Sequence, residues 1–301
     1  MTFDLSAWCS SELGSPVAGV LYERVSISTV SGVRLADGRE VYVKARPDDG
    51  RAVSCVAAQA FLAARAFPCP RPLTPVVVAD GLAVHAEEPL PGGKMLLGSS
   101  PDVARRYAAV FARLMALLAG VSVPPPLPSP RWARWDHTGP GLWPAIHFLD
   151  ARDQSVVPSL VSEMAWRVRK RLLATSLPCV LGHADFEAQN LRWHDGEVLA
   201  VHDWDSLAWQ PEAALAGAAS GAFANVSPPG LVPIGSSAAF LGTYQQVRGR
   251  AFSVEEKEIA WAGSMWTALH NARWEVLHGD PTPSGDAVRE QGAERLRLAN
   301  A

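Results

Sequence analysis

The sequence predicts an α+β protein, because strand-like and helix-like patterns divide its 301 residues. Residues 39–45 alternate polar and apolar side chains like a half-buried strand, and short apolar runs at 76–78 and 82–84 follow. The last third has helical spacing, and Ser253 with Glu256 forms a capping box that opens a long helix. Hydrophobic residues make up 48% of the chain, which is enough for a substantial core.

The first strand ends in a candidate binding residue. Residues 39–45 follow the turn signal Asp37-Gly38 and precede an Ala-rich segment, 51–66, that we expect to be a helix. Lys44 therefore lies at the end of a hairpin strand and ahead of a helix, which is the position of the phosphate-binding lysine in kinase sites. We expect Lys44 to bind nucleotide phosphate.

The partner of this lysine is less clear from the sequence. In the kinase template the helix after the lysine strand offers a Glu, yet no acidic residue occurs between positions 51 and 79. Gln59 is the polar side chain best placed to stand in. A Gln accepts a hydrogen bond from an ammonium group but supplies no ion-pair attraction. The lysine is then either held more loosely or paired elsewhere.

Later elements follow from apolar spacing and from prolines. The proline-rich residues 67–73 predict a rigid connection. Residues 132–144 form an irregular aromatic segment, which is either a packing loop or one wall of a ligand pocket. Helices are expected over residues 101–119, 158–174, 211–224, 236–248 and 253–277.

The most informative segment is Gly-His-Ala-Asp-Phe-Glu-Ala-Gln-Asn at residues 182–190. A buried strand should lead into it and a hairpin, with Asp195-Gly196 at its turn, should lead out of it. That hairpin would bring Asp203 back beside Asn190.

These residue types suit phosphoryl transfer. In the kinase template an Asp accepts the proton of the attacking hydroxyl, an Asn five residues later holds magnesium, and a later Asp bridges magnesium to the phosphates. Hard cations of this kind prefer oxygen ligands. The spacing predicts Asp185 as the base, with Asn190 and Asp203 as magnesium ligands.

The segment resembles the Brenner-type motif of the aminoglycoside phosphotransferase and choline kinase family, which has His-Gly-Asp, four residues, Asn, and then an Asp-rich strand end. The resemblance implies a two-lobed, protein-kinase-like fold with a small antiparallel-sheet lobe and a larger helical lobe. It implies Mg²⁺-dependent transfer of the terminal phosphate of ATP or GTP to a small-molecule hydroxyl. The expected limits are residues 1–88 for the N-lobe, 89–93 for the hinge and 94–301 for the C-lobe.

The resemblance also implies roles for residues around this core. His183 is expected to brace the catalytic loop, and Asp205 to support the site. At the hinge Pro89 has no N–H, so the carbonyl of Glu88 and the amide of Leu90 are the candidates for binding adenine.

The phosphate loop of the family is not evident as a glycine repeat. Ser26 and Ser28 lie where it is expected, and they either contact phosphate or are plain strand residues. Ala184 replaces the family's central Gly, which strains the backbone only if φ is positive there. Ala214 occupies the position of an anchoring Asp.

Two other functions compete with the kinase. A metal-dependent hydrolase could use His183, Asp185, His202 and Asp203, but it leaves Lys44 without a role. A catalytically degenerate nucleotide-binding homologue is the other alternative, encouraged by the missing acid on the helix and by the two alanines.

Charge and composition limit the partners. A net charge of −3 argues against a nucleic-acid binder, and the chain shows neither a signal peptide nor a membrane-spanning run, which predicts a cytoplasmic protein. The implied acceptor is an antibiotic such as an aminoglycoside, a sugar or an amino alcohol. Eleven tryptophans and the lack of a concentrated acidic cluster favour a weakly charged acceptor. The sequence does not predict an oligomeric state.

Overall fold

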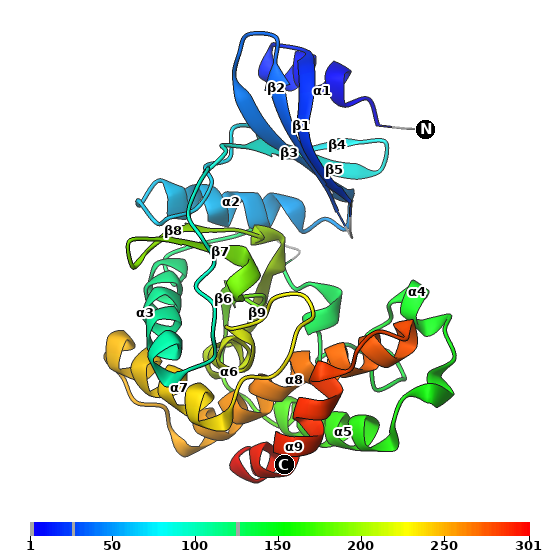
Figure 1. The fold of residues 1–301 in the computed structure, drawn as a ribbon, viewed down its shortest axis with the longest axis vertical. Helices are drawn as coiled ribbons and strands as arrows, with labels where there is room; N and C mark the ends of the chain where they lie inside the picture. Colours follow the sequence, from blue (N-terminus) through cyan, green and yellow to red (C-terminus); the bar gives the residue numbers. More distant parts are fainter. Residues whose placement is uncertain (1–2, 26–27, 125–126) are drawn as a thin grey trace. The chain divides into compact units, whose positions relative to one another are not determined.

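The computed structural model describes residues 3–25, 28–124 and 127–301, and the chain divides into two compact units (Figure 1). The N-terminal unit combines three stretches, Met1–Gly93, Val121–Pro128 and His194–Asp205. The C-terminal unit comprises Lys94–Gly120, Ser129–Trp193 and Ser206–Ala301. In the part of the chain that the structure describes, no helix is long and apolar enough to cross a membrane.

The N-terminal unit is built on a five-stranded antiparallel sheet in the order β1-β2-β3-β5-β4 (Figure 1). The strand expected around Lys44 is the central one, β3. The strands are β1 (Val17–Val25), β2 (Thr29–Leu35), β3 (Glu40–Pro47), β4 (Val77–Ala79) and β5 (Leu82–Glu87), and the helices are α1 (Leu5–Leu13) and α2 (Ala52–Ala63).

The two faces of this sheet differ in character. Val43 and Ala45 of β3 are buried in an apolar cluster that includes Trp8 of α1. Side chains alternate along a strand, so Lys44 and Arg46 point to the opposite face. The alternation that predicted the strand therefore also gives the sheet one apolar face and one polar face.

The C-terminal unit is mainly helical, as the spacing of apolar residues predicts. Helix α9 was not anticipated, and neither was β9, a strand that pairs antiparallel with β6. The strands are β6 (Cys179–His183), β7 (Leu191–His194) and β9 (Leu207–Pro211), and the helices are α3 (Pro101–Leu118), α4 (His147–Asp150), α5 (Ser159–Leu173), α6 (Glu212–Ala222), α7 (Ile234–Arg248), α8 (Val254–His278) and α9 (Pro283–Leu298).

Helices α6 and α8 pack unusually closely. A Cβ atom added at Gly217 would lie 2.0 Å from the backbone oxygen of Ala260, and one at Gly221 would lie 2.3 Å from that of Ser264. These pairs are spaced by four residues on both helices, so glycine lines one stripe of α6. The close approach fixes α6, which begins directly after β9, against the longest helix of the unit.

One turn and one helix cap have the local geometry that the sequence predicts. Asp195 and Gly196 have φ angles of 47° and 84°, as a two-residue hairpin turn requires, and β7 and β8 (Glu197–Val201) form the predicted two-stranded sheet. The capping box at the start of α8 is also present.

Candidate active site

Lys44 is held by an acid from the neighbouring strand. Its Nζ lies 2.9 Å from Oε1 of Glu87 on β5, and both side chains are nearly buried. Lys44 pairs with His85 in the β3–β5 register, so Glu87, two residues further along β5, lies on the same face of the sheet. Of the two sequence-based alternatives, the structure shows the second: the lysine is paired elsewhere.

Gln59 of helix α2 contacts this acid. Its Nε2 donates to Oε2 of Glu87 at 2.9 Å and to the backbone oxygen of Pro70 at 2.8 Å. The side chain is 1% exposed. Gln59 thus supports the partner of Lys44 from helix α2, the element that supplies the acid itself in the kinase template.

The surroundings of Lys44 are strongly charged. Burial alone would lower the pKa of Lys44, but the negative charges of Glu87, Asp205 and Asp203 outweigh it and hold that pKa above its ordinary value. Burial lowers the pKa of His85 to about 4, with a further contribution from the Lys44 charge. His85 is therefore neutral near pH 7 and adds no competing positive charge.

Asp205 lies two residues after Asp203, the predicted metal ligand, and its carboxylate is paired with an arginine. It forms a nearly buried ion pair with Arg46 of β3, and its backbone oxygen accepts from Arg51 at 3.1 Å. Burial would raise the pKa of Asp205, but Arg46 and Lys44 overcome this and lower it. The carboxylate stays ionised at neutral pH.

Asp203 has a backbone conformation that few residues adopt. Its φ is 61°, in the left-handed region that Asp and Asn tolerate better than other non-glycine residues. It lies close enough to Lys44 to raise the pKa of that ammonium. An unusual φ at a charged residue is typical of functional sites.

The loop at residues 183–190 of the C-terminal unit brings Asp185 and Asn190 together. The Nδ2 atom of Asn190 donates to the backbone oxygen of Asp185 at 3.0 Å and to its Oδ2 at 2.7 Å. His183 is fully buried and its Nδ1 accepts from the backbone N–H of Asp185 at 3.2 Å. This contact fixes the backbone at Asp185.

The middle of the same loop is fixed by residues that the sequence did not single out. Glu187 is 3% exposed, and its Oε1 accepts from Nδ2 of Asn225 at 2.9 Å. Its Oε2 accepts from Gln189, also at 2.9 Å. Asn225 further accepts from the backbone of Gly230 at 3.0 Å, so the loop is tied to the segment after α6.

Ala184 does not strain this loop. It is not among the described non-glycine residues that have a positive φ, so replacing the family's Gly costs nothing in backbone energy. Together with Ala214 it lines a cavity of about 10 Å³, room for one water molecule. The two departures from the family pattern thus border the same small space.

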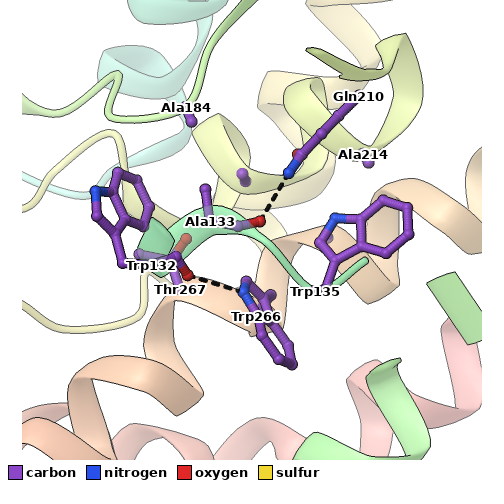
Figure 2. A pocket seen from close by; sticks show the side chains of 10 residues that line it. Trp132, Ala133, Trp135, Ala184, Gln210, Ala214, Trp266 and Thr267 are labelled. Carbon is purple, nitrogen blue, oxygen red and sulfur yellow. Dashed lines mark hydrogen bonds between the residues drawn. The ribbon is translucent and has the colours of Figure 1, made fainter. Parts of the chain in front are cut away.

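Tryptophans surround this cavity, as Figure 2 shows. Nε1 of Trp266 donates to the backbone oxygen of Trp132 at 3.1 Å, and Gln210 of β9 donates to that of Ala133 at 2.7 Å. Arg169 donates to the backbone oxygen of Trp135 at 2.7 Å. The aromatic segment is therefore anchored by side chains from α5, α8 and β9.

A second cavity of about 450 Å³ opens in the C-terminal unit. Trp143 and Trp166 line it, as does Arg273, whose Nη2 donates to Oδ1 of Asp150 at 2.8 Å. Asp150 is the one acid among the described residues that line this cavity. Trp143 also contacts Trp266, with ring centroids 5.5 Å apart, so it lies between the two cavities.

The residues predicted to contact adenine or phosphate, Glu88, Leu90, Ser26 and Ser28, lie outside the sheet strands or outside the described residues. The N–H of Glu88 donates to the backbone oxygen of Arg71 at 2.9 Å, while its carboxylate forms an ion pair with the Arg71 side chain. Leu90 lies in the irregular stretch after β5. Ser28 lies at a bend before β2, and Ser26 lies outside the described residues.

The sequence did not identify Glu87 as a site residue, although a signal was present. Glu87 is the last residue of an otherwise apolar strand, where an acid is costly to bury unless it is paired. Arg46 could have been found in a similar way, because it is a charged residue two positions after Lys44 and therefore lies on the same face of β3.

The fold and the pairing of Asp185 with Asn190 are typical of one class of protein, the kinase-like phosphotransferases. A profile of the phosphotransferase enzyme family (APH) matches residues 30–214, more than half of the chain. The chain belongs to this family and is a small-molecule phosphotransferase. That membership decides against the hydrolase alternative. No curated protein matches the chain in sequence.

Solved structures agree with this fold. Amicoumacin kinase hAmiN, solved with AMP-PNP, Ca²⁺ and Ami, has a TM-score of 0.64 at 14% identity, over 93% of this chain and 88% of that one. Spectinomycin phosphotransferase APH(9)-Ia, solved with ADP and spectinomycin, has a TM-score of 0.58 at 10% identity, over 98% and 92%. A putative fructosamine-3-kinase from Thermobifida fusca has a TM-score of 0.52 at 19% identity, over 99% and 98%.

These matches concern the fold alone. They confirm the expectation of an antiparallel-sheet part followed by a mainly helical part in a protein-kinase-like fold.

Proposed function

We propose that this protein transfers the terminal phosphate of ATP or GTP to a hydroxyl group of a small molecule. The observation that carries the proposal is the pairing of Asp185 with Asn190 in a chain of the phosphotransferase family. The hydrogen bond from Nδ2 of Asn190 orients the Asp185 carboxylate, and an oriented carboxylate is a suitable acceptor for the proton of a hydroxyl group.

In the proposed reaction Asp185 is the base. The acceptor hydroxyl would donate its proton to the Asp185 carboxylate as its oxygen attacks the terminal phosphorus. The bond from that phosphorus to the bridging oxygen breaks, and the nucleoside diphosphate leaves with the electron pair. Because this transition state needs little covalent help, alignment and charge neutralisation supply most of the rate.

Lys44 would neutralise part of that negative charge directly, and Asn190 and Asp203 would contribute by holding a cation. Their donor sets fit a hard cation and its phosphates, since Asp203 offers carboxylate oxygens and the amide oxygen of Asn190 lies on the side away from the nitrogen that holds Asp185. We assign Asn190 and Asp203 as the residues that would hold Mg²⁺, which would supply positive charge to stabilise the phosphate oxygens. Lys44 would hold the phosphates as a point charge.

The base of the nucleotide is assigned to the hinge. We propose residues 89–93 as the hinge between an N-lobe of residues 1–88 and a C-lobe of residues 94–301. Because the N–H of Glu88 is engaged with Arg71, its carbonyl and the amide of Leu90 are the groups assigned to adenine. Ser28 stays a candidate for phosphate contact.

The acceptor is proposed to be a weakly charged hydroxylated molecule, such as a sugar or a hydroxylated natural product. The 450 Å³ cavity supports this, because Trp143 and Trp166 offer flat apolar surfaces. Its acid, Asp150, is already paired with Arg273. A polycationic aminoglycoside would gain little charge attraction there.

The test begins with nucleotide binding. We expect ATP or GTP to raise the melting temperature only with Mg²⁺ present, and we expect Lys44→Ala and Asp203→Ala each to remove that shift. A panel of hydroxylated acceptors is then screened for phosphate transfer. Stabilisation by neither nucleotide would overturn the proposal in favour of a degenerate homologue.

The base is tested separately. Asp185→Asn should lose at least about 10²-fold to 10⁴-fold in turnover while its nucleotide affinity stays within a few-fold of the parent. Asp195→Asn, the same change at an exposed turn, should leave turnover unchanged. Equal turnover in the parent and in Asp185→Asn would refute the base assignment.

A further inference from the structure

The acid that holds the phosphate-binding lysine lies in the sheet and not on the helix. Lys44 and Glu87 lie on β3 and β5, which are directly hydrogen-bonded neighbours, and the ion-pair distance is 2.9 Å. In the kinase template the corresponding acid belongs to the helix after the lysine strand. Here that helix, α2, contributes the neutral Gln59.

We infer that Glu87 is the positioning residue of Lys44, and that Gln59 serves as a brace that orients the Glu87 carboxylate. This inference rests on the proposed role of Lys44 in binding nucleotide phosphate. It adds that the acid paired with Lys44 comes from strand β5 and not from helix α2. Helix α2 contributes a neutral hydrogen-bond donor, Gln59, in place of a charged partner.

The hydrogen bonds divide the Glu87 carboxylate between two partners. Oε1 faces Lys44 at 2.9 Å, and Oε2 accepts from Gln59 at 2.9 Å. The Gln59 nitrogen also donates to the backbone oxygen of Pro70, so the amide is itself fixed. Oε1 therefore faces the ammonium and Oε2 faces the amide, with Nε2 of His85 at 3.9 Å from Oε2.

The other groups around the pair cannot replace this acid. Arg46 carries a positive charge and is already paired with Asp205. Asp203 and Asp205 raise the pKa of Lys44 through space, but the ion-pair contact is made by Glu87. His85 is neutral, because burial lowers its pKa to about 4. A buried ammonium left without a contacting acid is strongly destabilised.

The placement has a consequence for control of the enzyme. An ion pair between a lysine and a mobile helix breaks when the helix moves. An ion pair between adjacent strands of one sheet stays intact. The lysine of this protein therefore has its acid in place before nucleotide binds, and α2 contributes only the orientation of that acid through Gln59.

The experiment is a pair of mutational cycles read out by the Kd for MgATP, which requires no acceptor. Glu87→Gln should weaken binding at least 10-fold, and Glu87→Asp should do so less. In a Lys44→Ala background Glu87→Gln should change the Kd less than 3-fold. Glu40→Gln, an exposed change on β3, is the matched control and should have no effect.

The second cycle moves the carboxylate from strand β5 to helix α2, the element that carries it in the kinase template. The double variant Glu87→Gln with Gln59→Glu again places one carboxylate and one amide beside Lys44. We expect it to recover at least half of the loss in log Kd caused by Glu87→Gln. A purely structural role of Glu87 would give no such recovery, so absence of rescue in a double variant that melts cooperatively would overturn the inference.

The outcomes separate the inference from the function on which it rests. If Lys44→Ala binds MgATP as the parent does, the proposed function of Lys44 fails. If Lys44→Ala loses binding while Glu87→Gln keeps it, the function stands and the inference fails.

Discussion

The side-chain nitrogen of Asn190 donates to two oxygens of Asp185, one from the backbone and one from the carboxylate. One amide therefore holds both the conformation of the loop and the direction of the proposed base. The second atom of that amide, Oδ1, is the one assigned to the metal. An acid at position 190 could serve the metal but not the base, which explains why the side chain is an amide.

This relationship predicts the effect of Asn190→Asp. The new carboxylate would lie against that of Asp185, and two like charges so close share a proton, which raises one pKa. We expect kcat to fall roughly 10²-fold near neutral pH and the remaining activity to rise with pH as the shared proton is lost. Asn300→Asp, at the exposed end of the chain, is the control. A pH profile of unchanged shape would contradict the prediction.

Asp203→Asn should separate metal binding from folding. Asn tolerates the left-handed backbone at φ 61°, so the melting temperature without ligand should be nearly that of the parent. Loss of the carboxylate should weaken MgATP binding at least about 10-fold, equal to roughly 1.4 kcal/mol. Titration calorimetry measures this. Asp80→Asn, at another Asp with positive φ in an exposed turn, should bind as the parent does.

Two glycine substitutions should have opposite effects on stability, one in the close contact of α6 and α8 and one on an open face of α7. Gly217→Ala places a methyl group where the backbone oxygen of Ala260 would be 2.0 Å away, so we expect a loss of about 3 kcal/mol in the free energy of unfolding. Gly242→Ala on α7 has nothing within 4 Å of the new carbon and should gain about 0.5–1 kcal/mol. Urea titration measures both. Similar values for the two variants would mean that the helices can separate.

Buried histidines predict a loss of stability in mild acid. Burial lowers the pKa of His270 to about 4, as it does for His85, from an ordinary 6.5. Between these values the unfolded chain binds more protons than the folded one, so stability is complete above pH 6.5 and falls as the pH drops towards 4. Each group contributes up to about 1.4 kcal/mol per pH unit.

The variant His270→Gln tests this. It should flatten the dependence of the unfolding free energy on pH between 6.5 and 4, whereas His194→Gln, at an exposed side chain, should not. If both variants keep the slope of the parent, the acid sensitivity has another origin.

Local signals made the hairpin turn, the capping box and the contact between Asp185 and Asn190 predictable. The turn at Asp195 and Gly196 requires positive φ at both residues. Asp followed by Gly is a residue pair that favours this conformation, so the turn is predictable from the sequence. The capping box of Ser253 and Glu256 is equally local. Asp185 and Asn190 are five residues apart, so the loop that contains them also brings them together.

Features that depend on contacts between residues far apart in the sequence were not predicted. Strand β9 lies directly before α6, and its pairing with β6 cannot be read from its own five residues. Helix α9 starts where Glu275 of α8 accepts from the backbone of Ser284 at 3.1 Å, a cap supplied from another helix. Glu87 meets Lys44 only through the register of two strands separated by α2.

The three-part make-up of the N-terminal unit affects its biosynthesis. Residue 93 leaves the ribosome well before residue 205, and at ordinary translation rates the interval is on the order of ten seconds. During that time β3 already carries Arg46 and Lys44 but lacks the carboxylates of Asp203 and Asp205. The nascent sheet therefore carries an excess of positive charge on one face until the segment with the proposed metal ligand has been synthesised.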